Sequence, residues 1–600
     1  MHPRVLSVTA LLLLTLASIP VAGQEPQPSR PLSRDWKRLK TPSLTVIGNA
    51  SDHDLRRTAV EIERFRVAIR ALAPTTPMSS PVPMLAVVFR DDSALTPFKP
   101  RNRGKPVDNV AAYFSALPDI NYIVLAPHDD REFTYRVIFH EYTHFLVYRA
   151  APRLPMWLNE GLADFYSTFN GSETDNRMIL GRPIVAYRTT LRSEGGLIPF
   201  KKFLSSDALP ELLKTPQAMH RYYAQSWAFT HYLLLGERGA YRPKVKAFVA
   251  ALQSGQSSDR AFAEVFGQEV DALERGLRAY LDLPTMMAMQ LPSVELQLDM
   301  PIERLPELDV LQVQGDLLAR HGAYDEADKR LSKAAEIDRL SIPVRLSRAR
   351  LLLGQERTTD AVDILEAPDL QSATDFGTTF WRAEAFRSAK RYEDAIVAYR
   401  RALAVYQDSA PSYFGLSLSQ QALGKSEAAA NFTRCVMARP EPSWYYRRIM
   451  ESQRLGLDTF VYADATSFVR QSGWQNGSSA YAMFVAALTA MRQQKQAQAG
   501  EILDEIAANV EAQSWQAAIA DYLRGSLPID RFLKKASPDE LLTEAHAYIG
   551  IKAHIDGDQA TALQHLRWVK EKGRRNYTEY GLALGELDRI SRETNAAPIP

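Results

Sequence analysis

The second half of the chain repeats with a period of 34 residues. Alanine recurs at Ala327, Ala361, Ala395 and Ala429, three equal intervals in succession. A small side chain at one position of every repeat lets two helices cross closely, and stacked helix pairs bury apolar surface that one pair leaves exposed. Strand signals disappear beyond residue 308, so this half is predicted to be an all-helical array.

The best copy of the repeat reads RYEDAIVAYRRA from Arg391 to Ala402, and a proline closes the unit. Small residues at the helix crossing, an aromatic residue at the turn and this period resemble the tetratricopeptide repeat (TPR). The resemblance covers 308–595 and implies an all-α solenoid whose surface binds a protein partner. Weaker copies continue around Ala499 and Ala562. A helical bundle with chance alanine spacing is the alternative.

The first half, 41–283, alternates strand and helix signals and is predicted to be an α+β domain. The predicted strands are 44–47, 83–89, 110–114 and 122–125, and the predicted helices are 55–72, 132–149, 161–169 and 218–235. Four prolines then cluster at Pro284, Pro292, Pro301 and Pro306. This cluster predicts a Pro-rich linker at 284–307 between the two halves.

The amino terminus is typical of an export signal. Arg4 precedes the apolar run Val5–Ile19, and small residues follow near Ala22. The apolar run is shorter than the about 20 residues that cross a bilayer. We therefore expect a signal peptide at 1–23, a flexible leader at 24–40 and no membrane span after cleavage; an uncleaved anchor is the alternative. The expected location is the bacterial periplasm or the secreted fraction.

Composition excludes two classes of protein. A formal net charge of +2 and the absence of a long basic run argue against nucleic acid as a partner. The single cysteine, Cys435, excludes an internal disulfide framework and any all-cysteine metal site. Metal chemistry in this chain would therefore have to use histidines and carboxylates.

One short motif carries most of the functional information: His140-Glu141-Tyr-Thr-His144, inside the predicted helix 132–149. Residues four apart share a helix face, so both imidazoles can reach one metal ion. Glu141 lies beside them, where it can take a proton from a water molecule held by that ion. The alternative is a pair of surface or core histidines on a helix that binds no metal.

A second segment, Trp157-Leu-Asn-Glu160-Gly-Leu-Ala-Asp164, follows the first. A catalytic zinc ion needs three protein ligands and one open position, and Glu160 can complete a set of two histidines and one glutamate. Asp164 is one helical turn further on, placed to accept a hydrogen bond from the distal nitrogen of a ligand histidine. Alternatively, Glu160 only stabilises the start of its helix and Asp164 is a solvated side chain.

Together the two segments resemble the gluzincin metallopeptidases, more narrowly the exported "peptidase MA-like" proteins. The resemblance covers roughly 40–280. It implies a zinc-peptidase-like α+β domain ahead of the all-α TPR solenoid, with Zn²⁺ held by His140, His144 and Glu160, and with Glu141 as the base. The 15 residues between His144 and Glu160 are fewer than in thermolysin-like enzymes, so cleft details and specificity are not carried over.

Gluzincins also use a tyrosine or histidine from a later helix to stabilise the oxyanion of the reaction. Tyr223 is the first candidate here and His231 the second, because both lie with Trp227 on one face of the predicted helix 218–235. The spacing of Tyr223 and Ser226 is similar to the corresponding helix of peptidase MA-like proteins. An aromatic stripe packed in the core is the alternative.

The sequence thus predicts an exported zinc metallopeptidase that acts on a protein or peptide, more naturally an endopeptidase than an aminopeptidase. Residues 109–114 could form an edge strand that pairs with an extended substrate. Two alternatives stay open. One is a non-catalytic exported TPR scaffold with a structural or degenerate zinc site, and the other is a zinc hydrolase that acts on something other than peptides.

Overall fold

The computed structural model describes most of the chain. The described residues are 35–72, 82–102, 105–107, 110–127, 131–151, 154–171, 177–193, 196–205, 208–213, 215–254, 256, 258–267, 270–292, 296, 299–438, 442–455, 458–474, 476–536, 541–574 and 577–596. The predicted signal peptide lies outside them. Within them, no helix combines the length and apolar character needed to cross a membrane.

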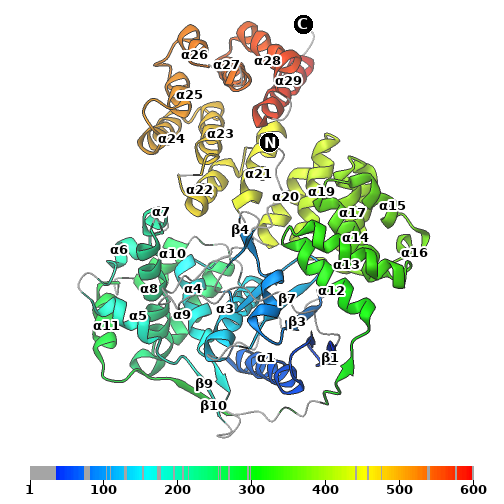
Figure 1. The fold of residues 1–600 in the computed structure, drawn as a ribbon. Helices are drawn as coiled ribbons and strands as arrows, with labels where there is room; N and C mark the ends of the chain where they lie inside the picture. Colours follow the sequence, from blue (N-terminus) through cyan, green and yellow to red (C-terminus); the bar gives the residue numbers. More distant parts are fainter. Residues whose placement is uncertain are drawn as a thin grey trace. The chain divides into compact units, whose positions relative to one another are not determined.

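A six-stranded mixed sheet organises the first half (Figure 1). Its strands, in spatial order, are β11 (Glu303–Arg304), β1 (Lys37–Lys40), β2 (Thr45–Gly48), β3 (Met84–Val88), β7 (Asn121–Leu125) and β6 (Ala112–Ala116). β2, β3 and β7 run parallel, and the other pairs are antiparallel. The four predicted strands are confirmed, including the hairpin of β6 and β7, and β6 forms one edge.

Side chains of the central strands alternate between two cores. Ala86 and Ile123 point to a core shared with helices α1 (Asp52–Leu72) and α3 (Arg131–Ala150). Their neighbours Val87 and Val124 point to the other face, where Leu317 and other residues of α12 (Glu307–Arg320) cover them. Because strand side chains alternate with a period of two, both faces of this sheet are apolar and both need a cover. The first repeat helix supplies one cover.

Two predicted boundaries are wrong because the segments at those boundaries form strands of the sheets. The leader was expected to extend to residue 40, but Trp36 is fully buried and Lys37–Lys40 form β1. The predicted linker 284–307 contains β10 (Met289–Pro292), which pairs with β9 (Arg177–Leu180), and β11, which pairs with β1. The proline-rich segment therefore contributes edge strands to two sheets.

Beside the sheet, α4 (Met156–Ser167) and α8 (Pro216–Leu235) pack closely. A Cβ atom at Gly161 would lie 2.1 Å from Thr230 Oγ1 and 2.3 Å from the Ser226 carbonyl oxygen. Glycine at this position is what permits the approach. Other elements here include β8 (Asn170–Gly171), α5 (Val185–Arg192), α6 (Phe200–Phe203), α9 (Arg242–Gln253), α10 (Ser258–Phe266) and α11 (Val270–Asp282).

The helical repeat array is confirmed. The helix pairs are α12 with α13 (Tyr324–Ile337), α14 (Ile342–Gly354) with α15 (Thr358–Leu365), α17 (Phe376–Ser388) with α18 (Tyr392–Val405), and α19 (Ala410–Ala422) with α20 (Glu427–Ala438). The four alanines of the 34-residue period are buried in the second helix of each pair. The left-handed residue at each turn keeps the same period, at Gly322, Glu356, Lys390 and Gly424.

Further helices continue from residue 442. They are α21 (Pro442–Leu455), α22 (Val461–Ser472), α23 (Ser479–Arg492), α24 (Gln496–Asn509), α25 (Trp515–Arg524), α26 (Ile529–Lys535), α27 (Leu542–Ile555), α28 (Gln559–Lys572) and α29 (Thr578–Ala596). Ala499 and Ala562, the weaker copies, are buried in α24 and α28. The helices α21 to α29 share one apolar core.

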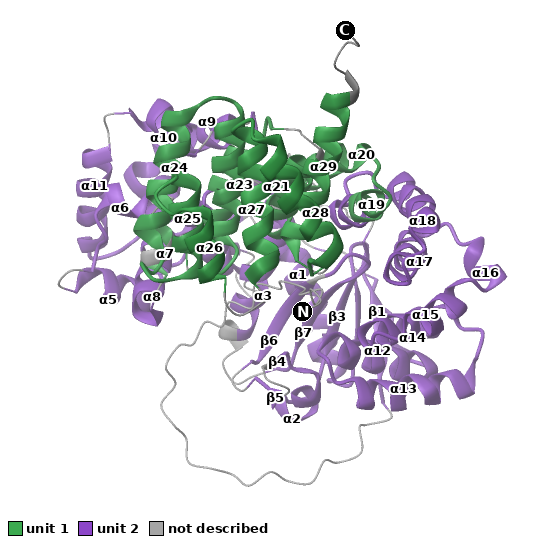
Figure 2. Cartoon of the chain, turned by 90° about the horizontal axis from the view of Figure 1, so that it is seen from above, with its two compact units in different colours: residues 1–4, 205–214, 416–600 green, residues 5–204, 215–415 purple. Residues whose placement is uncertain are grey.

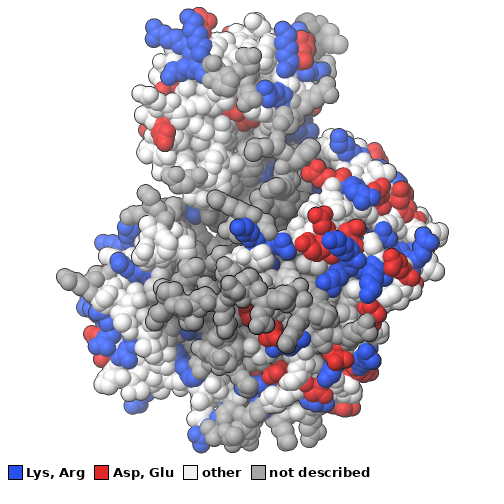
Figure 3. Space-filling view, in the orientation of Figure 1, with Lys and Arg blue, Asp and Glu red and all other residues white. Residues whose placement is uncertain are grey.

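The chain divides into two compact units (Figure 2). Among the described residues, unit 2 contains those of 35–204 and 215–415, and unit 1 contains those of 205–213 and 416–596. The division falls inside α19, not in the predicted linker, because the first repeats share a core with the sheet. On the face shown in Figure 3, acidic and basic side chains are interspersed over the repeat helices that belong to unit 2.

Candidate metal centre

The helix α3 presents two different faces. Ile138, Phe139 and Tyr142 belong to the core beneath the sheet, and Phe139 stacks on Phe65 of α1 at 4.3 Å between ring centroids. At 100° per residue, His140 and His144 lie on the opposite side of the helix from this core. Packing of the apolar face therefore fixes the direction in which both imidazoles point.

The third candidate ligand comes from α4. His140 Nε2 lies 3.1 Å from His144 Nε2 and 3.6 Å from Glu160 Oε2, and His144 Nε2 lies 3.4 Å from the same Oε2. His140 and Glu160 are buried, and His144 is half-buried. Among the described residues this is the single group of His, Cys, Asp and Glu side chains close enough to share a metal ion.

The other ring nitrogens fix the tautomers. His140 Nδ1 lies 3.0 Å from Asp164 Oδ1, and His144 Nδ1 lies 3.2 Å from the Asn159 side-chain oxygen. Both partners are acceptors, so each Nδ1 carries the proton and each Nε2 of a neutral ring presents a lone pair. Two nitrogen lone pairs and one carboxylate oxygen therefore converge on one point.

Three acceptors facing one another need a cation between them. Glu160 Oε2 is buried and has no hydrogen-bond partner within the described chain. In a tetrahedral site with bonds of about 2.0–2.1 Å, neighbouring ligand atoms lie about 3.3–3.4 Å apart, and the three measured separations bracket this spacing. The donor set and its geometry fit a divalent metal ion.

The electrostatics of the cluster agree with this. Burial alone would lower the pKa of His140, but the Asp164 and Glu160 carboxylates outweigh it and raise that pKa well above its usual value. The pKa of His144 is raised in the same way, chiefly by Glu160. Burial raises the pKa of Glu160, but the two imidazoles outweigh it and lower that pKa to about 2. Positive charge is thus strongly favoured at this point.

Glu141, the predicted base, is half-buried beside the cluster. Burial raises the pKa of its carboxyl group, while His140 and His144 pull it down and Glu160 pushes it up. A carboxylate whose proton affinity is raised by burial is suited to accept a proton near neutral pH.

The structure places Asp164 where the sequence predicted, and it adds two residues that the sequence analysis missed. Asn159 orients His144 as Asp164 orients His140. Tyr187, on α5, is 2% exposed, and burial together with the nearby Asp164 carboxylate raises its pKa well above the usual value. Asn159 lies inside the second motif, so the sequence could have suggested it. No sequence pattern pointed to Tyr187.

Of the two oxyanion candidates, the structure brings only Tyr223 to the cluster. Burial, followed by the Glu160 and Asp164 carboxylates, raises the pKa of Tyr223, and within the described chain its side chain makes no hydrogen bond. His231 is a correction: it is fully buried, with Nε2 2.7 Å from the Gly181 carbonyl oxygen and Nδ1 2.9 Å from the Tyr280 hydroxyl. Neither nitrogen of His231 is available to a substrate.

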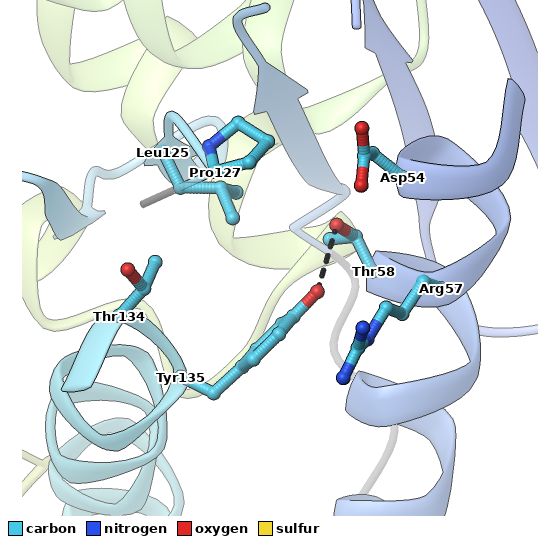
Figure 4. Close-up of a pocket in the computed structure, with 7 residues that line it drawn as sticks. All are labelled: Asp54, Arg57, Thr58, Leu125, Pro127, Thr134 and Tyr135. Carbon is cyan, nitrogen blue, oxygen red and sulfur yellow. Dashed lines mark hydrogen bonds between the residues drawn. The ribbon is translucent and has the colours of Figure 1, made fainter. Parts of the chain in front are cut away.

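A small pocket lies elsewhere around α3 (Figure 4). It is lined by Asp54, Arg57, Thr58, Leu125, Pro127, Thr134 and Tyr135. Tyr135 projects towards α1, and its hydroxyl lies 3.3 Å from Thr58 Oγ1. None of the predicted site residues lines this pocket, so it is separate from the candidate metal centre.

The chain is similar to one family model and to a solved TPR structure. A family model described as a protein of unknown function (DUF1570) matches residues 136–254, a segment that contains both motifs and Tyr223. No curated protein matches the chain. Among solved structures, the crystal structure of the P58(IPK) TPR domain is 13% identical, and the match covers 66% of this chain and 100% of that one at a TM-score of 0.18.

Proposed function

We propose that this protein is an exported zinc-dependent metallopeptidase whose helical repeats, of TPR type, bind a protein substrate or partner. The observation that supports it best is the convergence of His140 Nε2, His144 Nε2 and Glu160 Oε2 at 3.1–3.6 Å, with the carboxylate oxygen left without a hydrogen-bond donor in the described chain. A set of two imidazoles and one carboxylate without sulfur is typical of catalytic zinc.

The chain's own residues divide the work of peptide hydrolysis. Zinc, when bound, polarises the peptide carbonyl and lowers the pKa of water. Glu141 accepts the proton of the attacking water and delivers it to the leaving amine. The Tyr223 hydroxyl, which makes no hydrogen bond within the described chain, donates to the developing oxyanion. Asp164 and Asn159 hold the two ligand imidazoles in the required tautomer.

The sheet offers a place for an extended substrate. β6 pairs with β7 on one side, and in the described sheet it has no partner on the other. A free strand edge can bind an extended backbone through main-chain hydrogen bonds. This supports a protein or peptide as the substrate, and the repeats would add binding surface away from the reacting bond.

The first test is the zinc content of the purified mature protein, beside a His144→Ala variant. We expect about one equivalent in the parent and none in the variant, since two remaining ligands cannot hold a catalytic ion. A folded parent that stays free of zinc after reloading would remove the mechanism.

The second test separates an enzyme from a scaffold. Glu141→Gln should keep its zinc and lose peptide hydrolysis by about 10²–10⁴-fold, the usual contribution of a general base. The assay is cleavage of a peptide library followed by mass spectrometry. If Glu141→Gln retains every measurable function of the parent, the site is structural and the scaffold alternative is correct.

A further inference from the structure

One charged side chain beside the metal centre has no role in the proposed mechanism. Arg136 precedes His140 by four residues and His144 by eight, so the three residues form one row along α3. The side chain is half-buried. Within the described part of the chain it makes no hydrogen bond and no ion pair.

Arg136 lies near Tyr187, a residue beside the centre. Tyr187 lies close to both Asp164 and Arg136: the carboxylate raises the pKa of its hydroxyl and the guanidinium lowers it. Asp164 is already engaged by His140, and Glu160 faces both imidazoles. Neither carboxylate forms a hydrogen bond or an ion pair with Arg136 within the described chain, although Glu160 Oε2 and Asp164 Oδ2 each lack a hydrogen-bond donor there.

A half-buried guanidinium without an acceptor loses hydration and gains nothing in return. The group that best restores this loss is a carboxylate, which guanidinium binds through two parallel charge-assisted hydrogen bonds. No described carboxylate bonds to Arg136, so a ligand can supply one. The position of Arg136 next to the ligand row makes the substrate the natural source.

We propose that Arg136 binds a carboxylate of the substrate and so makes the enzyme selective for peptides that carry one near the scissile bond. This inference rests on the proposed peptidase function. Four residues of helix span about 6 Å, and an extended substrate advances about 3.3–3.6 Å per residue. The carboxylate therefore belongs to a residue within about two positions of the cleaved bond, as an Asp or Glu side chain or as the free C-terminus.

The direct test measures binding and needs no turnover. Two hydroxamic acids serve as probes, one with a carboxylate arm and one with the matching carboxamide, and each is titrated into zinc-loaded protein. The parent should bind the acid about 10- to 100-fold more tightly than the amide, the usual effect of a hydrogen-bonded charge pair. Arg136→Gln should bind the two equally, and Arg136→Lys should keep only part of the preference because lysine cannot form the paired contact.

Arg221→Gln is the matched control, because Arg221 is exposed on α8. It should keep the full preference of the parent for the acid. If the parent shows no preference, or if Arg136→Gln retains it while still binding zinc, the inference is wrong. If Arg136→Gln fails to fold, Arg136→Lys serves instead: a reduced preference for the acid supports the inference, and a full preference contradicts it.

A second experiment identifies the source of the carboxylate. Peptide libraries with free and with amidated C-termini are digested by the parent, and the cut sites are sequenced. Loss of cleavage on amidation assigns the C-terminus; enrichment of Asp or Glu near the cut in amidated peptides assigns a side chain. Cleavage with neither bias overturns the inference and leaves the proposed function intact, whereas a parent without zinc overturns both.

Discussion

Two clusters of buried charged residues lie in the same compact unit, and they differ in one respect. In the first, the carboxylate of Asp316 on α12 is fully buried and accepts hydrogen bonds from Arg320, Arg350, Ser347 and Tyr122. In the second, Glu160 is also buried, but its Oε2 atom faces only two imidazole nitrogens and accepts no hydrogen bond within the described chain. Donors and acceptors are matched in the first cluster and unmatched in the second.

The first cluster stabilises the fold, whereas the second has the donor set of a ligand-binding site. The Asp316 network extends to Asp119, in the turn between β6 and β7, through Arg350 at 2.8 Å. It therefore joins the first repeat helices to the sheet within the unit. The Glu160 cluster joins α3 to α4, but its geometry is satisfied only when a cation is added. Buried acceptors that face one another without a donor call for an explanation, and a bound cation supplies one here.

The largest expected effect comes from breaking the matched network. Asp316→Asn removes a charge that two arginines share, leaving them buried without their main acceptor. We expect a loss of about 3–5 kcal/mol in the free energy of unfolding, measured by urea titration. Glu307→Gln, which disrupts the exposed pair with Lys333, is the control and should cost at most about 1 kcal/mol. Equal losses in both variants would contradict the comparison.

A pH titration sharpens the same contrast. His321, at the end of α12, lies 3.0 Å from the Tyr113 hydroxyl of β6, and burial together with nearby Arg320 and Arg101 lowers its pKa to about 4. Because the unfolded chain takes up this proton first, stability should be complete above pH about 6.5 and fall between about 6.5 and 4 by at most about 3 kcal/mol. His321→Gln should flatten this part of the stability profile; an unchanged slope would exclude His321 as the cause.

A smaller effect is expected from weakening the support of the metal ligands. Asp164→Asn keeps the shape of the side chain but removes the charge that favours the Nδ1–H tautomer of His140. We expect zinc affinity to fall about 10- to 100-fold, measured by competition with a chelator, and the free energy of unfolding of the zinc-loaded protein to fall by the corresponding about 1.4–2.7 kcal/mol. An affinity equal to that of the parent would show that Asp164 does not orient His140.

The sequence predicted the features that depend on local geometry. His140, His144, Glu160 and Asp164 could be placed because residues four apart share a helix face, and the repeats could be placed because their period is regular. What it missed depends on contacts between distant segments. Asp119 and Arg350 are 231 residues apart, and the strands β1, β10 and β11 are too short to show a pattern of alternation.

One error has an instructive cause. His231 and Tyr223 do share a helix face, as predicted, but eight residues separate them, which is about 12 Å along the helix. At that distance His231 meets Gly181 and Tyr280, and a different environment surrounds each end of the same stripe. Sharing a face shows that two residues point the same way, and it leaves open what each one meets.

Asn159 gives the finest comparison, because it supports His144 with a neutral oxygen where Asp164 supports His140 with a charged one. Asn159→Ala should lower zinc affinity by less than Asp164→Asn, about tenfold or less, since a neutral hydrogen bond contributes about half as much as a charge-assisted one. Asn159→Asp should raise zinc affinity above that of the parent, because the added charge favours the Nδ1–H tautomer of His144. Chelator competition on the three variants gives the order. If Asn159→Ala weakened binding more than Asp164→Asn, the charge on the supporting oxygen would not set the strength of the site.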